Sequence, residues 1–212
     1  MRMNRTFIKY LLGALLFIPQ GIYAQRIVAE CTLEYSIQPD TSFQMNKSST
    51  YWGTKKVFIK GNDARVDVES SGFFQSLIYD KANQQAVVLR VLGTNKFITR
   101  LPPADWLLEN KKFDSLKITY QSATKTIIGY ECKMATMLLK DGSEYRLYYT
   151  TNIAPSVREF DYVFKDIPGF VLEYEVKQAN RSVRYIATRI SFSPVAASRF
   201  DIPVSGYRIL DK

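Results

Sequence analysis

Four carboxylates in the C-terminal third come nearest to a catalytic pattern in this sequence. They are Asp161, Asp166, Glu173 and Glu175, and the two glutamates lie two positions apart in an expected strand, so they share one face. A general acid and base pair needs at least one carboxyl group withdrawn from water. In this alternating stretch we expect both glutamates to face solvent. Carboxylates also suit calcium, but their spacing does not match an EF-hand loop.

The absence of histidine from all 212 residues excludes more chemistry than any other feature of the composition. It rules out a Ser-His-Asp triad, a Cys-His dyad and a histidine metal site. No Walker loop and no GxGxxG motif is present, so nothing predicts a nucleotide site. We therefore expect a protein that is not an enzyme, with no cofactor and no metal.

The first 24 residues are typical of a secretory signal peptide. Arg2, Arg5 and Lys9 form a basic start, and residues 10–18 form an apolar run that is too short to span a bilayer. Ala24 then offers a cleavage site, whereas an uncleaved membrane anchor is the alternative. We expect residues 25–212 to be periplasmic or secreted, and not integral to the membrane after cleavage.

Export shapes the interpretation of the positive charge. The chain has 29 Lys and Arg against 20 Asp and Glu, a formal charge of +9, but its basic clusters are small: Lys55-Lys56, Lys111-Lys112, and Arg181 with Arg184. An exported protein is not expected to meet nucleic acid. Such clusters suit anionic lipid head groups or an acidic protein partner, and the alternative is an ordinary solvated surface.

Cys31 and Cys132 are the only cysteines. In an oxidising compartment an even count predicts a disulfide, and here only one intramolecular pairing exists. Closing a loop of about 100 residues would stabilise the fold by roughly 4–5 kcal/mol at most. The alternative is two buried thiols that pack as small hydrophobic side chains.

Most of the remaining sequence alternates in polarity, which predicts strands. In residues 31–38, Cys31, Leu33, Tyr35 and Ile37 share one face. Further strands are expected at 57–60, 64–69, 73–79, 85–92, 96–101, 116–120, 131–139, 144–150, 170–177, 183–192 and 206–210. Helices are expected at 104–113, after two prolines, at 156–163, and as a short turn within 193–200.

These elements predict one mainly β domain over residues 25–212. An open sheet of about ten strands is unusual when flat, so it must curl. Two or three short helices cannot cover both of its faces. We therefore expect a single curved antiparallel sheet, a half-barrel that wraps partly around the helices.

The C-terminal half resembles a group of uncharacterised exported bacterial proteins, the GLPGLI family. Residues 166–174 (DIPGFVLEY) are similar to its Leu-Pro-Gly-Leu-Ile motif, with Phe170 and Val171 in place of Leu and Ile. Residues 129–133, 148–153 and 193–207 support the likeness, which covers roughly 125–210. The resemblance implies the LolA-like fold of periplasmic lipoprotein carriers, with an apolar cavity for acyl chains. No carrier-specific functional residue is matched.

We expect a periplasmic, non-enzymatic binding protein that holds an apolar ligand, a lipid or a lipoprotein acyl chain, between the curved sheet and the helix at 104–113. The strand residues expected to line the cavity are Leu33, Tyr35, Val57, Ile59, Val66, Val68 and Leu89, and the helix would add Trp106 and Leu107. The alternative is that these side chains fill the core and that the protein is an envelope interaction or assembly factor. A hydrolase that uses carboxylates alone is a third hypothesis.

Overall fold

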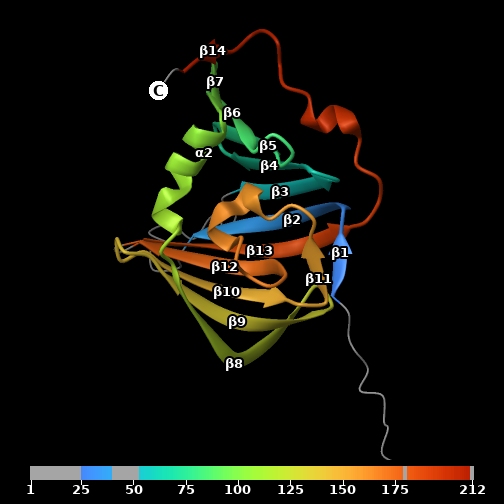
Figure 1. The fold of residues 1–212 in the computed structure, drawn as a ribbon, viewed down its shortest axis with the longest axis vertical. Coiled ribbons are helices and arrows are strands. Elements are labelled where there is room, and N and C mark those ends of the chain that lie inside the picture. Colours follow the sequence, from blue (N-terminus) through green and yellow to red (C-terminus); the bar gives the residue numbers. More distant parts are fainter. Residues whose placement is uncertain (1–24, 40–52, 179–180, 211–212) are drawn as a thin grey trace, which may run out of the picture.

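The computed structural model describes residues 25–39, 53–178 and 181–210. Within them, twelve strands form one curved open sheet in the order β14-β7-β6-β5-β4-β3-β2-β13-β12-β10-β9-β8 (Figure 1). All neighbouring strands of this sheet are antiparallel except β14 and β7. The expected fold class, a mainly β protein with a single curved antiparallel sheet and short helices, is confirmed. The predicted signal peptide, residues 1–24, lies outside the described residues.

The first half of the sheet is a meander of six consecutive strands. They are β2 (Glu30–Pro39), β3 (Gly53–Lys60), β4 (Asp63–Ser70), β5 (Phe73–Asp80), β6 (Gln85–Leu92) and β7 (Asn95–Leu101). Alternation sets their faces as expected: in β4, Ala64 and Val66 are buried on the concave side, while Arg65 and Asp67 pair on the other.

The second half contains five strands from the rest of the chain. They are β8 (Lys117–Ile127), β9 (Tyr130–Leu138), β10 (Glu144–Thr150), β12 (Phe170–Gln178) and β13 (Arg181–Ser191). β13 pairs with β2, and this one junction joins the two halves into a continuous sheet. Register shifts occur in β8, β10–β12 and β13–β2, where bulges add to the curl.

A helix crosses the open side of the curl. α2 (Pro103–Asn110) and the 3₁₀ turn η3 (Lys111–Phe113) connect β7 to β8, which lie near opposite edges of the sheet (Figure 1). Proline is tolerated at the start because the first helical N–H groups have no partner within the helix. Of the α2 side chains, only Trp106 and Asn110 are buried.

The second expected helix, at 156–163, is a shorter 3₁₀ segment, η4 (Glu159–Phe164). Asp161 divides it, because its φ of −117° and ψ of 68° are not helical. η4 lies on the concave side of the sheet, where it contacts β4 and β5. Residues 193–200 contain the expected short turn, η5 (Ala197–Phe200), and the last strand is β14 (Arg208–Ile209).

Two short strands were not expected from the sequence. β1 (Arg26–Val28) and β11 (Ile153–Pro155) form a separate parallel pair. The Ser156 N–H donates to the Val28 carbonyl over 3.0 Å and extends this pairing. The pair fixes the chain just before η4.

The sheet buries side chains on both faces. The concave face carries the main core, which includes the fully buried Leu33, Ile59, Leu147 and Leu172. On the other face, a second cluster consists of Ile78, Val87, Leu89 and Ile98. Phe200, Ile202 and Tyr207 of the C-terminal segment cover it. Among the described residues, no helix is long and apolar enough to cross a membrane.

Candidate functional site

A hollow of about 430 Å³ lies between the concave face of the sheet, α2 with η3, and η4. Its volume falls within the range of small-molecule sites. Eight of its side chains are aromatic. The lining consists of Leu77, Val88, Arg90, Leu101, Trp106, Glu109, Asn110, Lys112, Phe113, Tyr145, Phe160, Asp161, Tyr162, Val163, Phe164, Tyr174, Val176 and Tyr185.

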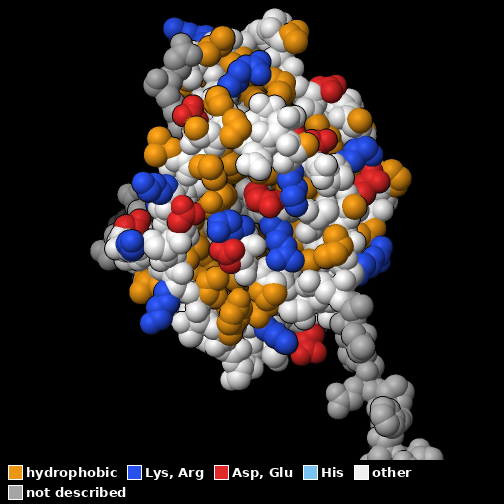
Figure 2. Space-filling view, in the orientation of Figure 1, with side chains coloured by type: hydrophobic (Ala, Val, Ile, Leu, Met, Phe, Trp, Pro, Cys, Tyr) orange, Lys and Arg blue, Asp and Glu red, His pale blue; other side chains and the backbone are white. Residues whose placement is uncertain are grey.

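Polar side chains interrupt these aromatic walls. The Arg90 Nε donates to Gln75 over 3.0 Å, and the Asn110 side chain donates to the Trp106 carbonyl over 2.8 Å. Figure 2 shows charged side chains of both signs beside hydrophobic ones on the face that carries η4. Such a wall suits a ligand with an apolar body and a polar group.

Behind this wall, Lys55 is buried on the concave face of β3, with 6% of its side chain exposed. Its Nζ lies 2.6 Å from Asp161 Oδ2 and donates to the Tyr174 hydroxyl over 3.0 Å. It also lies 5.0–5.9 Å from the ring centres of Tyr35, Tyr174 and Tyr185. The ammonium therefore occupies a cage of one carboxylate and three tyrosine rings. We call these five residues the lysine cage.

The lysine cage keeps its lysine charged and its tyrosines neutral. Burial acts to lower the pKa of Lys55, but the negative charge of Asp161 and its hydrogen bond to the ammonium outweigh it, and the pKa lies above the ordinary value for lysine. Burial raises the pKa of Tyr35 and that of Tyr174 well above the ordinary tyrosine value. The Tyr35 hydroxyl is itself held, donating to the Val171 carbonyl over 2.6 Å.

Trp106 places a polar atom in the packed part of the same wall. Its Nε1 is buried and has no hydrogen-bond partner among the residues that the structure describes. The Tyr162 ring stands edge-on to the indole, with ring centres 6.4 Å apart, and Tyr79 packs against it at 5.2 Å. Aromatic contacts thus surround the indole.

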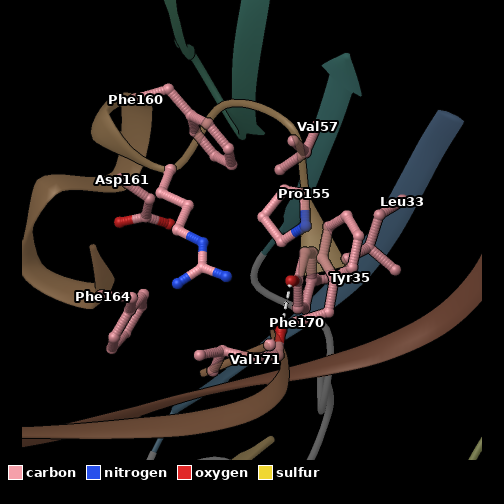
Figure 3. A pocket seen from close by; sticks show the side chains of 11 residues that line it. Leu33, Tyr35, Val57, Pro155, Phe160, Asp161, Phe164, Phe170 and Val171 are labelled. Atoms are coloured by element: carbon pink, nitrogen blue, oxygen red, sulfur yellow. Dashed lines mark hydrogen bonds between the residues drawn. The ribbon is translucent and has the colours of Figure 1, made fainter. Parts of the chain in front are cut away.

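η4 separates the large hollow from a small one of about 30 Å³, room for little more than a water molecule. Phe160, Asp161 and Phe164 line both spaces. Figure 3 shows these three side chains facing Leu33, Tyr35 and Val57 across the smaller space.

The structure scatters the residues expected to line the cavity. Leu33, Tyr35 and Val57 surround only the small hollow, and Ile59, Val66 and Val68 belong to or pack against the main core. Trp106 does line the large hollow. Two residues lie elsewhere: Leu89 is in the cluster on the opposite face, and Leu107 is 51% exposed on the outer side of α2. The expectation that these two residues line the cavity is wrong. Strand alternation points the Leu89 side chain to the opposite face of the sheet, and the turn of the helix points the Leu107 side chain to solvent.

The predicted disulfide is not present: Cys31 and Cys132 are free and buried. Cys31 lies opposite Ile59 in the β2–β3 pair, and Cys132 lies opposite Lys125 in the β8–β9 pair. Three strands, β13, β12 and β10, separate β2 from β9 in the sheet, which explains why the two cysteines are not neighbours. Burial raises the pKa of Cys31 to about 12 and that of Cys132 to about 11.

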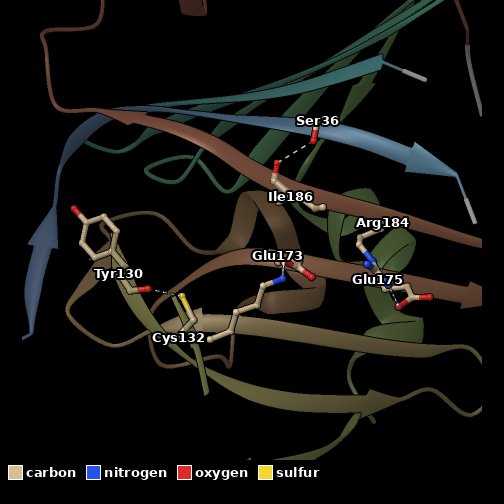
Figure 4. A network of polar contacts seen from close by, with 8 residues as sticks. Ser36, Tyr130, Cys132, Glu173, Glu175, Arg184 and Ile186 are labelled. Carbon is tan, nitrogen blue, oxygen red and sulfur yellow. Dashed lines mark hydrogen bonds and ion pairs between the residues drawn. The ribbon is translucent and has the colours of Figure 1, made fainter. Parts of the chain in front are cut away.

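The carboxylates that suggested catalysis are each paired with a cation. Lys125 reaches Glu173 over 2.5 Å, Arg184 lies 3.4 Å from Glu175, and Lys165 pairs with Asp166 over 3.0 Å. Figure 4 shows Glu173 and Glu175 on one strand, with Arg184 beside Glu175. The expectation that Glu173 faces water is wrong, because only 7% of its side chain is exposed.

The adjacent basic residues Lys55 and Lys56 predict a surface cluster, but Lys55 is buried. The signal that could have found it is alternation: Lys55, Val57 and Ile59 share one face of β3, so a lysine stands in an apolar row. Lys56, on the other face, forms only a loose surface pair with Glu34 at 3.9 Å.

No protein-family model and no curated protein matches the sequence. Two crystal structures of PNGF-II superpose on 87% and 86% of this chain with a TM-score of 0.52 and identities of 16% and 14%. This chain spans about a third of PNGF-II, 32% and 31%. A β-barrel-like protein of a domain of unknown function, DUF1849, from Brucella abortus is similar with a TM-score of 0.42, 9% identity, and coverage of 79% of this chain and 99% of that one.

MucB is similar with a TM-score of 0.35, 9% identity, and coverage of 83% of this chain and 58% of that one. At these identities, the likeness to PNGF-II shows a shared fold and nothing about activity. The curved sheet of this chain thus also occurs as a part of a longer protein.

Proposed function

We propose that the protein is an exported, non-enzymatic binding protein that holds a ligand with an apolar body and a polar end in the hollow on the concave face. The observation that carries this proposal is the hollow itself, about 430 Å³ with eight aromatic side chains. A sheet of this size could have filled its concave side entirely with core residues. Lipids and acyl chains are the ligand class we favour.

The remaining chemistry supports binding over catalysis. Asp161, Glu173 and Glu175 are each held by a cation or by a neighbouring hydroxyl, and Asp161 lies on a different element from the two glutamates. Export is proposed from the basic start and apolar run of residues 1–24.

The test is saturable binding of an apolar fluorescent probe, N-phenyl-1-naphthylamine, to purified protein from which bound lipid has been extracted. Val176→Trp places an indole in the hollow and should weaken binding at least tenfold, because the probe and the indole compete for one volume. Leu92→Trp is the matched control, since Leu92 is 47% exposed outside the hollow. Non-saturable binding, or equal affinity in both variants, would overturn the proposal.

A second candidate function is recognition of an envelope protein. Two adjacent leucines on the outer side of α2, Leu107 and Leu108, are 51% and 64% exposed, and an exposed apolar pair on a helix suits a protein contact. A photo-crosslinking residue at position 108 should then capture one defined protein in cells, while the same residue at position 92 should not. Equal capture at both positions would argue against this role.

A further inference from the structure

The burial of Lys55 calls for an explanation beyond stability. A buried ion pair gains little over apolar side chains of similar size, because both charges lose their hydration. Lys55 stands in a row with Val57 and Ile59, where an aliphatic side chain would pack without that loss. Buried charged groups whose pKa is shifted from the ordinary value cluster at functional sites, especially beside a cavity.

Asp161, the partner of Lys55, occupies a special position. It belongs to η4, which walls both hollows, and its non-helical backbone divides that segment. Its side chain is 25% exposed against 6% for Lys55. The carboxylate therefore lies between the ammonium and the open hollow.

We propose that Lys55 is the head-group site for a ligand that carries a carboxylate on an apolar chain, and that Asp161 occupies this site when no ligand is bound. The proposal rests on the proposed binding function and adds the chemical class of the ligand. The apolar chain would lie in the large hollow along its aromatic walls.

Exchanging the Asp161 carboxylate for a ligand carboxylate leaves the net charge around Lys55 unchanged. A ligand carboxylate replaces the Asp161 carboxylate on the same ammonium, so no unpaired charge is created inside the protein. Asp161 turns toward the hollow and regains water, which its partial exposure allows. No bond is made or broken and no proton is transferred.

The lysine cage favours a small, planar anion. The Tyr174 hydroxyl lies 3.0 Å from the ammonium, and the rings of Tyr35 and Tyr185 enclose the remaining directions. Tyrosine hydroxyls are neutral near pH 7 at their ordinary pKa, and burial raises the pKa of Tyr35 and Tyr174 further, so neither repels an anion.

The experiment compares dodecanoate with dodecan-1-ol, which share one chain and differ in the head group. By calorimetry or probe displacement, the unmodified protein should bind dodecanoate at least tenfold more tightly. Lys55→Met should abolish this preference, so that the two compounds bind with similar affinity. Lys56→Met is the matched control, because it removes the adjacent lysine on the opposite face and should keep the preference.

Asp161→Asn provides a second, independent readout. Without the internal carboxylate, dodecanoate no longer has to displace a competitor, so its affinity should rise at least fivefold. Dodecanoate should also raise the melting temperature of this variant by more than that of the unmodified protein.

The outcomes separate this inference from the proposed function. Equal affinity for dodecanoate and the alcohol would overturn the inference and leave the binding function standing. If dodecanoate, dodecan-1-ol and the fluorescent probe all fail to bind saturably, the binding function itself is overturned. Should Lys55→Met fail to fold, an unchanged dodecanoate affinity in Asp161→Asn would still overturn the inference.

Discussion

The ammonium of Lys55 lies 2.6 Å from the carboxylate of Asp161, although 106 positions of sequence separate the two residues. The contact ties η4 to the floor of the curved sheet, and it does so beside the hollow. Lys81 holds the outer end of the same region through the Ser156 carbonyl, at 2.9 Å. Lys81 also lies 3.8 Å from Glu159, the first residue of η4, and the Tyr162 hydroxyl donates to Asp114 over 3.0 Å. η4 is thus anchored in the interior by Lys55 and near the surface by Lys81 and Asp114.

The two halves of this pair should respond differently to mutation. Asp161→Asn leaves Lys55 buried without a counter-charge and should lower the free energy of unfolding by about 3 kcal/mol. Lys55→Met replaces the buried cation with an apolar side chain and leaves Asp161 partly solvated, so the change should stay below about 1 kcal/mol. Urea unfolding of both variants at pH 7 tests this, and equal losses would contradict it.

Gly169, in the motif that resembles the GLPGLI signature, should not tolerate a side chain. Its φ is 152°, and an added Cβ would lie 1.9 Å from the Thr150 carbonyl oxygen. Gly169→Ala should therefore destabilise the fold by ~3 kcal/mol or more.

Gly142→Ala is the control for this prediction. Gly142 has a φ of 82° but no atom within 4 Å of an added Cβ, so its substitution should cost only ~1 kcal/mol. Thermal unfolding of both variants decides between a steric and a purely conformational role, and similar losses would refute the steric one.

The local rules of strands and turns explain why most of the sheet could be predicted. The residues of β4 alternate between Ala, Val and charged side chains, and its hairpin with β3 turns at a glycine, so both were visible in the sequence. The β1–β11 pair was not visible, because three-residue strands that pair in parallel across a long stretch of chain leave no periodic signal.

The site was harder to predict because it depends on how distant segments meet. Alternation could show that Lys55 shares a face with Val57, but not that Asp161 from η4 would reach it. Leu89 was misplaced because β6 is apolar on both faces, and only the paired structure shows that Val88 faces the hollow and Leu89 the other side.

The free thiols should make the fold sensitive to alkali. Burial raises the pKa of Cys31 from 9.0 to about 12 and that of Cys132 to about 11. The unfolded chain loses these protons first, so their contribution to stability is complete below pH 9 and falls as the pH rises toward 11–12. Cys31 alone should remove about 1 kcal/mol between pH 7 and pH 10.

Urea unfolding at the two pH values, with the protein and its Cys31→Ala variant, measures this contribution. The variant should be less stable at pH 7, because a buried side chain has been shortened, but it should lose less on going to pH 10. Identical pH dependence in the two proteins would show that Cys31 is not buried in the folded state.

Val88 and Leu89 are neighbours on β6 that should separate binding from stability. Val88 lines the hollow, whereas Leu89, 3% exposed, packs with Ile78 and Ile98 under the C-terminal segment. Leu89→Ala should lower the free energy of unfolding by about 2–4 kcal/mol and leave the affinity for N-phenyl-1-naphthylamine unchanged. Val88→Ala should change the probe affinity at least threefold, because it alters a wall that the probe touches.

The free energy of unfolding and the probe affinity are measured on each variant at a temperature where both variants remain folded. A loss of probe affinity in Leu89→Ala, with Val88→Ala unaffected, would mean that the ligand lies on the outer face of the sheet, beneath Phe200 and Ile202.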